Sequence, residues 1–341
     1  MGSEDRLTRK RPTIRDVAER AGVSKSLVSL VVNDSPRVSD KSRTAVLSAI
    51  DELGYRPSAA ARGLVNQRSG LVGIVMSGSH DVFYAEILEG VASYLAENQL
   101  DTVPIILHGG HNRESESKAI DQCLELRTEC VMLMGSALSD DSIDRIGREV
   151  PVVIVGRRMN SEAIDVVSCD DELGAELATK HLLDLGHRRI AHITGGNGNG
   201  ASERETGYCR MMEQAGFKPT LIAGGYDMKY GTETGHRLLE GPGDIPTAVV
   251  AANDLVAIGL MDVLRKGGVR IPDDVSIVGY DDIVLAGLDS FDLTTISQSI
   301  HQMGKTVARL VCQRALDSEQ RPQTVLIDPA LVVRSTTQAA S

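Results

Sequence analysis

The chain has 341 residues, 42% of them hydrophobic, which is enough to bury a sizeable interior and excludes extensive disorder. This length predicts two or three domains. No run approaches the roughly 18 consecutive apolar residues of a membrane span, and the first residues lack the apolar segment of a secretory signal. Five cysteines without a CxxC pair disfavour a disulfide framework or a zinc site. We expect a cytoplasmic globular protein without a metal or cofactor.

Charge is distributed unevenly along the chain. Residues 1–68 contain 13 Lys and Arg against 8 Asp and Glu, a balance of +5, whereas the remaining residues have 23 against 39, a balance of −16. A basic segment in front of an acidic body indicates a separate module that binds a polyanion. A solvated basic tail is the alternative, and charge alone does not distinguish it from a polyanion-binding module. The motifs within the segment are needed for that.

The first predicted elements are three short helices with a tight turn between the first two. Thr13 is suited to cap a helix that Gly22 ends, and Ser24 can cap a second helix only two residues later. A third helix is predicted from Ser39 to Gly54. Apolar residues recur at helical spacing in all three: Val17, Ala18 and Ala21; Leu27, Val28, Val31 and Val32; Val46, Ile50 and Leu53. Two short helices across such a turn form a helix-turn-helix; an ordinary helical hairpin is the alternative, and the basic charge favours DNA binding.

The run "TIRDVAERAGVSKSLVSLVVNDSPRVSDKSRTAVLSAIDELGYRPSAAARGL" resembles the DNA-binding head of the lactose-repressor/galactose-repressor family of bacterial transcription regulators. The resemblance implies that the second helix enters the major groove of double-stranded operator DNA. Leu27 and Leu30 depart from the polar residues common in the family, and either pack on a thymine methyl or complete the core. The DNA-binding positions predicted in the head are Thr13, Ser24, Lys25, Ser26, Leu27 and Ser29.

The segment "PSAAARGLVNQRSG" follows the third helix and raises a separate question. From Ser58 to Leu64 it spans barely two turns, so a helix there needs a partner. In the family, two such segments of a dimer fold together on DNA and insert a leucine into the minor groove. Leu64 matches that leucine and Ala61 matches the close-packing position. A flexible linker with an incidental leucine is the alternative.

From Leu71 onward, short β-branched runs alternate with helix-length segments. "LVGIVM", "VPIIL", "CVMLM" and "PVVIV" form one series, and "RRIAHIT", "TAVVAA" and "DVSIVGY" form a second. The alternation predicts two lobes, each with a doubly wound parallel sheet, and a ligand in the cleft between them. This body resembles the periplasmic-binding-protein-like effector domain of the same family. The expected domains are 1–57 (helix-turn-helix), 58–68 (hinge) and 69–341 (effector binding and dimerisation), with lobe 1 at about 69–167 and 299–330 and lobe 2 at about 168–298.

The resemblance also implies which side chains line the cleft, and one position departs from the family pattern. Where the family often has an aspartate after the strand "PVVIV", this chain has Gly156, followed by Arg157 and Arg158. The change puts a standard hexose or nucleobase ligand in doubt, and an arginine here either favours an acidic ligand or only faces solvent. The ligand-binding residues implied by the resemblance are Phe83, Tyr84, Arg204, Asn253, Asp281 and Gln298.

Three classes of function were weighed against these features. An effector-responsive repressor leads, acting as a homodimer on DNA and responding to a sugar or related metabolite. A transport-type binding protein is disfavoured by the missing signal and the added head. A sugar-kinase-like enzyme is disfavoured because "GGNGNG" at 195–200 does not fit GxGxxG and "GKT" at 304–306 lacks the leading glycine of a phosphate loop. The C-terminal residues have no leucine heptad, so no coiled-coil tetramer is predicted.

Overall fold

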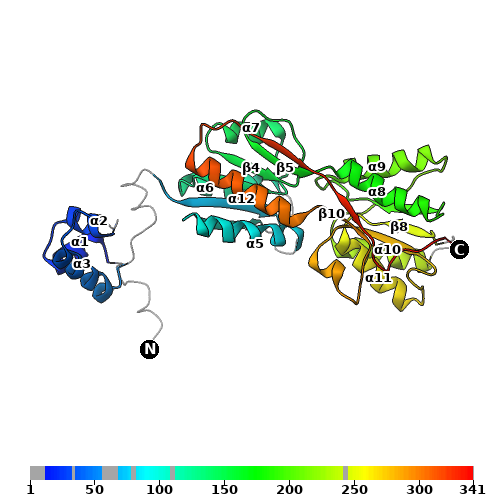
Figure 1. Cartoon of the computed structure of the whole chain (residues 1–341), viewed down its shortest axis with the longest axis horizontal. Helices are drawn as coiled ribbons and strands as arrows, with labels where there is room; N and C mark the ends of the chain where they lie inside the picture. The colour runs from blue at the N-terminus through cyan, green and yellow to red at the C-terminus, as the bar shows by residue number, and fades with distance from the viewer. Residues whose placement is uncertain are drawn as a thin grey trace. The chain divides into compact units, whose positions relative to one another are not determined.

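Two units make up the chain, residues 1–69 and residues 70–341 (Figure 1). Each unit has its own hydrophobic core. The computed structural model describes residues 12–32, 35–55, 68–77, 82–107, 112–240 and 245–340. Among these residues no helix is long and apolar enough to cross a membrane, and no group of three or more His, Cys, Asp or Glu side chains could hold a metal ion.

The first unit contains three helices, as the sequence predicts: α1 (Ile14–Ala21), α2 (Lys25–Val32) and α3 (Asp40–Leu53). Buried valines from all three helices form the core: Val17, Val28, Val31 and Val46. Gly22 and Gly54 end α1 and α3 with φ of 67° and 65°, a left-handed conformation that costs glycine little.

The helix starts of the first unit are capped by side chains. The Asp16 carboxylate accepts hydrogen bonds from the backbone N–H of Thr13, at 2.7 Å, and from its hydroxyl, at 2.8 Å. Ser24 Oγ accepts from the N–H of Leu27 at the start of α2. These bonds satisfy donors that the first helical turn leaves unpaired, and therefore fix where each short helix begins.

The first lobe of residues 70–341 is built on a six-stranded parallel sheet with the order β11-β5-β4-β3-β1-β2. Its strands are β1 (Leu71–Ser77), β2 (Asp101–Leu107), β3 (Cys130–Met134), β4 (Val152–Val155), β5 (Asp165–Cys169) and β11 (Thr324–Ile327). All residues of β3, β4 and β5 are buried, as expected for strands covered on both faces. Pro104 lies on the edge strand β2, where a missing N–H is tolerated.

Helices cover both faces of this first sheet (Figure 1). On one face, α5 (Val82–Glu97) and α12 (Ile300–Leu316) pack against each other and against the sheet. On the other face, α6 (Arg113–Glu125) and α7 (Asp140–Gly147) contribute Ile120 and Ile143 to a second core. Because α5 begins at Val82, just after β1, its first turn lies at the carboxyl edge of the sheet.

The second lobe repeats this architecture with the strand order β12-β10-β9-β8-β6-β7. Its strands are β6 (Ile190–Ile193), β7 (Thr220–Ile222), β8 (Ala248–Val250), β9 (Ser276–Asp281), β10 (Thr295–Ser297) and β12 (Ala330–Val332). One face is covered by α8 (Asp171–Asp184) and α9 (Ala201–Gln214), and the other by α10 (Met228–Glu240) and α11 (Asp254–Lys266). A short 3₁₀ helix, η1 (Val284–Gly287), follows β9.

The chain passes between the two lobes three times, after β5, after β10 and after β11. The last passage brings β12 antiparallel to β10, the one exception among the described strand pairs to parallel pairing. Residues from 330 onward therefore lie with the second lobe, and β5 extends the first sheet to Cys169. The predicted fold class, a small helical head and a body of two doubly wound lobes, is confirmed.

Candidate DNA-binding surface and effector cleft

Helix α2 presents one polar face to solvent. Lys25 and Ser26 are exposed and Ser29 is partly exposed, whereas Val28 and Val31 are buried in the core of the first unit. The tight turn before α2 places Lys25 at its first residue. The arrangement leaves the N-terminal half of α2 available to an external partner, as a recognition helix requires.

The two leucines of α2 have different surroundings. Leu27 is partly buried and packs against the core of the first unit, which agrees with the interpretation that it completes the core. Leu30 is 40% exposed and lies one helical turn beyond Ser26, on the accessible side of α2. The hinge positions Ala61 and Leu64 lie outside the described residues.

All six residues predicted for the cleft line a single cavity between the two lobes of residues 70–341. Its volume is about 50 Å³, room for only a few water molecules. The lining side chains come from both lobes, at the carboxyl ends of the parallel strands, where ligands bind in doubly wound sheets. Three further lining residues, Gly156, Asn199 and Tyr226, were not among the predicted ligand-binding residues.

Arg204, on α9, is the cationic centre of the cavity. Its Nε donates to Asp171 at 2.8 Å and one terminal nitrogen donates to the carbonyl of Ala252 at 2.7 Å. The other terminal nitrogen lies 3.8 Å from the Asp281 carboxylate, and the Tyr280 ring stacks 3.7 Å from the guanidinium carbon. Burial raises the pKa of Asp171, while the charge of Arg204 opposes that rise. The guanidinium is thus held rigidly between two carboxylates.

Asp281 ends β9 with an unusual backbone conformation, φ 114°, which non-glycine residues rarely adopt. Its carboxylate accepts a 2.6 Å hydrogen bond from Nε2 of Gln298, the residue that follows β10. Below it, Asp254 accepts from the backbone N–H of Ile283 at 2.9 Å and from the hydroxyl of Thr295. Asp254 therefore anchors the loop after Asp281. Residues like Asp281, whose strained backbone is held in place by surrounding contacts, concentrate at binding sites.

Asn253 lines the cavity, but both ends of its amide are engaged within the protein. Its carbonyl oxygen accepts from the N–H of Val256 at 2.9 Å, so it caps α11, and its amino group donates to the carbonyl of Tyr226 at 3.0 Å. The Tyr226 hydroxyl in turn donates to the carbonyl of Asn199 at 2.8 Å. Asn199 belongs to the "GGNGNG" loop after β6. Tyr226 follows β7, whose three residues are exposed or partly exposed and give no buried apolar run in the sequence.

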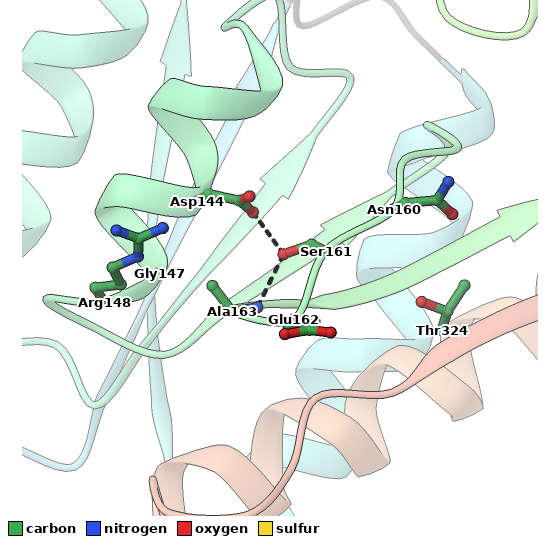
Figure 2. Close-up of a pocket in the computed structure, with 8 residues that line it drawn as sticks. All are labelled: Asp144, Gly147, Arg148, Asn160, Ser161, Glu162, Ala163 and Thr324. Carbon is green, nitrogen blue, oxygen red and sulfur yellow. Dashed lines mark hydrogen bonds between the residues drawn. The ribbon is translucent and has the colours of Figure 1, made fainter.

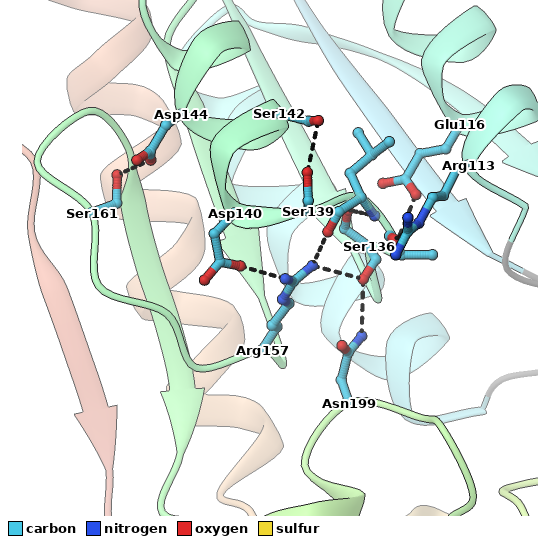
Figure 3. A network of polar contacts seen from close by, with 12 residues as sticks. Arg113, Glu116, Ser136, Ser139, Asp140, Ser142, Asp144, Arg157, Ser161 and Asn199 are labelled. Carbon is cyan, nitrogen blue, oxygen red and sulfur yellow. Dashed lines mark hydrogen bonds and ion pairs between the residues drawn. The ribbon is translucent and has the colours of Figure 1, made fainter.

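Arg157 does not face the cavity. Its guanidinium donates to the carbonyls of Ser136 and Leu138 and to the Asp140 carboxylate (Figure 3). The same Ser136 carbonyl accepts from Asn199 Nδ2 of the second lobe at 3.5 Å. Arg157 therefore holds the loop after β3 at the interface between lobes and does not point toward a ligand in the cavity. Arg158 is exposed, as the interpretation of a solvent-facing arginine expects.

A larger hollow, about 670 Å³, lies elsewhere on the first lobe (Figure 2). It is bordered by the end of α7, the loop before β5 and the start of β11. The hollow therefore lies at the amino ends of the strands, whereas ligands of doubly wound sheets bind at the carboxyl ends. Ser161, in its wall, already bonds to Asp144 and to the N–H groups of Ala163 and Ile164. Its polar groups hold the loop together, so the smaller cavity is the better candidate.

Comparisons with known proteins agree with this geometry. Residues 13–58 match the model of bacterial regulatory proteins of the lacI family, and residues 179–337 match a periplasmic binding protein-like domain. The HTH-type transcriptional repressor PurR of Photobacterium profundum is 32% identical over 94% of this chain and 97% of its own length. The HTH-type transcriptional regulator GalR of Escherichia coli (strain K12) is 32% identical over 96% of each chain. The chain belongs to the LacI family.

Solved structures extend the likeness to the whole fold of this LacI-family chain. The Lac repressor dimer bound to operator and the anti-inducer ONPF has a TM-score of 0.82 and 28% identity, covering 97% of this chain and 100% of that one. A LacI transcriptional regulator from a Rhodococcus species has a TM-score of 0.71 and 31% identity over 79% of this chain and 98% of its own. Family membership makes the chain an effector-responsive, DNA-binding transcription regulator.

Proposed function

We propose that this LacI-family chain represses transcription by binding a near-palindromic operator as a homodimer, and that a small metabolite in the cleft changes its operator affinity. In this proposal residues 1–57 bind DNA, 58–68 form the hinge, and 69–341 bind the effector and dimerise. Lys25, Ser26 and Ser29 contact DNA from α2. The effector contacts Phe83, Tyr84, Arg204, Asn253, Asp281 and Gln298.

The observation that carries the proposal is the convergence of six side chains on one cavity. These residues lie in five separate segments between positions 83 and 298, and no local pattern brings them together. A transport-type binding protein would share the cleft but not the helix-turn-helix with its exposed Lys25 and Ser26. The combination of both features supports ligand-controlled DNA binding.

The proposal also holds that the chain is not an enzyme and acts in the bacterial cytoplasm, where the DNA is. Its support is the set of curated relatives named above, which are transcription regulators. Charged side chains at the cavity form ion pairs within the protein, as Arg204 does with Asp171 and Asp281. A nucleophile with an adjacent base, the arrangement that covalent catalysis needs, is not among the described lining residues.

The test is selection of genomic DNA fragments by the purified full-length chain, followed by mobility shifts on the selected sequence. We expect a near-palindrome bound by a dimer, with affinity that falls steeply as salt rises because counterions are released. Metabolites are then added singly and the shift repeated. Binding that is equal for selected and random fragments, or full affinity of a monomer for one half-site, would contradict the proposal.

Leu64 gives a sharper test of the hinge in this proposal. Leu64→Ala preserves helix propensity and removes the apolar wedge, so operator affinity and the DNA bend should both decrease while thermal stability is unchanged. The measurements are operator affinity and bend angle at matched salt. Equal values for the variant and the unmodified chain would show that residues 58–68 act as a tether only.

A further inference from the structure

The loop after β9, in the second lobe, packs against the first lobe. Ile283 of this loop is 2% exposed and belongs to the hydrophobic core that α5 and α12 form in the first lobe. Leu285, two residues further on, is partly buried against the same core. Glu86 of α5 accepts a 2.9 Å hydrogen bond from the backbone N–H of Val284. Residues 283–285 therefore join the two lobes through apolar packing and a hydrogen bond, and we call this the lobe contact.

A buried carboxylate holds the loop that makes the lobe contact. Asp254, the first residue of α11, is fully buried. It accepts a 2.9 Å hydrogen bond from the backbone N–H of Ile283 and another from the hydroxyl of Thr295 on β10. The two residues before Ile283, Asp281 and Asp282, both have positive φ, 114° and 59°. Because such a backbone is strained, the loop depends on surrounding bonds to keep its conformation.

Asp254 has no cationic partner among the residues that the structure describes. The charged groups at this edge of the second lobe and across from it are acidic or already paired: Asp281, and Asp282 with Arg334, in and beside the loop; Glu86 on α5; Asp227 with Lys229 at the start of α10; and Asp171 with Arg204 at the cavity. An ionised Asp254 is therefore a buried charge held by hydrogen bonds alone, which is costly. Burial raises the pKa of this carboxyl to about 7, and the charge of Asp282 adds to the rise.

We propose that Asp254 is a proton-sensitive positioning residue, which stabilises the lobe contact when it is protonated and loosens it when it is ionised. In the packed loop the carboxyl is enclosed, whereas opening of the loop exposes it to water, where an aspartate has a pKa of about 3.9. The packed loop therefore binds the proton more tightly than the open loop. Its stabilisation by the proton is fully present below about pH 4 and is lost as pH rises through about 7. The contact between the lobes thus responds to pH without any ligand.

The test is hydrogen exchange of the full-length chain between about pH 5 and about pH 8, followed by mass spectrometry. Protection factors, corrected for the pH dependence of intrinsic exchange, are read from the peptide that contains Ile283 and Val284. In the unmodified chain they should fall about tenfold per pH unit between about pH 5 and 7, because opening then releases one proton, and level off at higher pH. Asp254→Asn cannot titrate and should give a flat profile. Thermal melting checks that the variant is folded.

Two further variants keep the result interpretable. Asp262→Asn removes an exposed carboxylate of the same helix, which pairs with Lys266, and should retain the slope of the unmodified chain. Thr295→Val removes a hydroxyl that stabilises the ionised form of Asp254, so the levelling should move to higher pH; this variant serves if Asp254→Asn does not fold. A slope that persists in folded Asp254→Asn, levelling at an unchanged pH in Thr295→Val, or a flat profile in the unmodified chain would overturn the inference.

The inference goes beyond the proposed function, and only its consequence for DNA rests on that function. Mobility shifts at matched salt should show an operator affinity that changes with pH in the unmodified chain and changes less in Asp254→Asn. Equal pH dependence in the two would remove Asp254 from the control of DNA binding. A pH-dependent lobe contact in a chain that selects no DNA sequence would contradict the proposed function alone, whereas selective DNA binding with a flat exchange profile would contradict this inference alone.

Discussion

The DNA-binding head and the effector cleft present their functional groups in opposite ways. In the head, Lys25 and Ser26 are exposed on α2, and the core beneath them is made of valines. In the cleft, Arg204 and Asp281 are each only 6% exposed and contact other polar groups of the protein. The head belongs to a segment with a balance of +5, and the cleft to one with a balance of −16.

This difference indicates how each region recognises its partner. Exposed charges act over distance and are screened by salt, which suits attraction to a polyanion. Buried, mutually bonded groups are already oriented, so a ligand that fits them loses little free energy to reorganisation. The same difference predicts that polar substitutions in the head change binding without changing stability, whereas polar substitutions in the cleft affect both.

The largest effect is expected at Arg204. Arg204→Ala leaves Asp171 and Asp281 buried without their cation, which should lower the free energy of unfolding of residues 70–341 by about 3–5 kcal/mol. Arg210→Ala is the matched control on the same helix, because its side chain is 47% exposed and its ion pairs should contribute less than about 1 kcal/mol. Urea unfolding measures both, and equal losses would contradict the contrast between buried and exposed charges.

The next effect concerns pH. Burial raises the pKa of the Asp254 carboxyl to about 7, with the nearby charge of Asp282 adding to the rise. Because an unfolded aspartate has a pKa of about 3.9, the folded state binds more protons at this group, and the contribution of Asp254 to stability should be fully present below about pH 4 and be lost as pH rises through about 7. The fall should be roughly 2–4 kcal/mol.

Asp254→Asn tests this pH dependence, since an amide at this position does not titrate. Unfolding at a series of pH values should show a flatter profile for the variant between about pH 4 and 7. Asp262→Asn on the same helix, α11, is the control, because Asp262 is exposed and pairs with Lys266. An unchanged slope in Asp254→Asn would mean that the carboxylate is already ionised throughout this range.

In the head, Lys25→Ala should weaken operator binding by about 1–3 kcal/mol and leave the melting temperature unchanged. If Lys25 contacts phosphate, the salt dependence of affinity should also lose about one unit of slope. Fluorescence anisotropy over a range of salt concentrations measures both quantities. Lys218→Ala, an exposed lysine of the second lobe, is the charge-matched control and should change neither. An equal loss in the control would remove α2 from the interface.

The smallest effect is expected where the lobes meet. Glu86 Oε1, on α5, accepts a 2.9 Å hydrogen bond from the N–H of Val284 in the second lobe. Glu86→Ala should make the Val284 amide exchange with solvent about five- to tenfold faster, corresponding to about 1 kcal/mol. Glu86→Gln retains an acceptor and should restore most of the protection. Hydrogen exchange followed by mass spectrometry of the η1 segment is the measurement, and unchanged exchange in Glu86→Ala would show that the bond does not persist in solution.

Local patterns in the sequence determined much of the fold. The caps and glycine stops of α1 and α3, and the long apolar runs of β1, β3 and β9, depend only on neighbouring residues and were predicted. The six predicted cleft positions came from the resemblance to a family, not from spacing, and their role in ligand binding stays a prediction. The alternation of strands and helices predicted two doubly wound parallel sheets, but the order of the strands within each sheet came from the structure.

What only the tertiary structure decided are contacts between segments distant in the sequence. Strands β7, β10 and β12 have three residues each and lie outside the apolar runs that predicted the other strands of this lobe, so pairing within the sheet is what makes them strands. The sequence also left the direction of Arg157 open, because the oxygens that hold it become neighbours only when the loop after β3 folds beside β4. Likewise, Asp171 and Asp281 meet around Arg204 only because the strand crossovers bring α8, α9 and the end of β9 to one edge. Side-chain charge is a property of sequence, but whether a charge is paired or free is decided by packing.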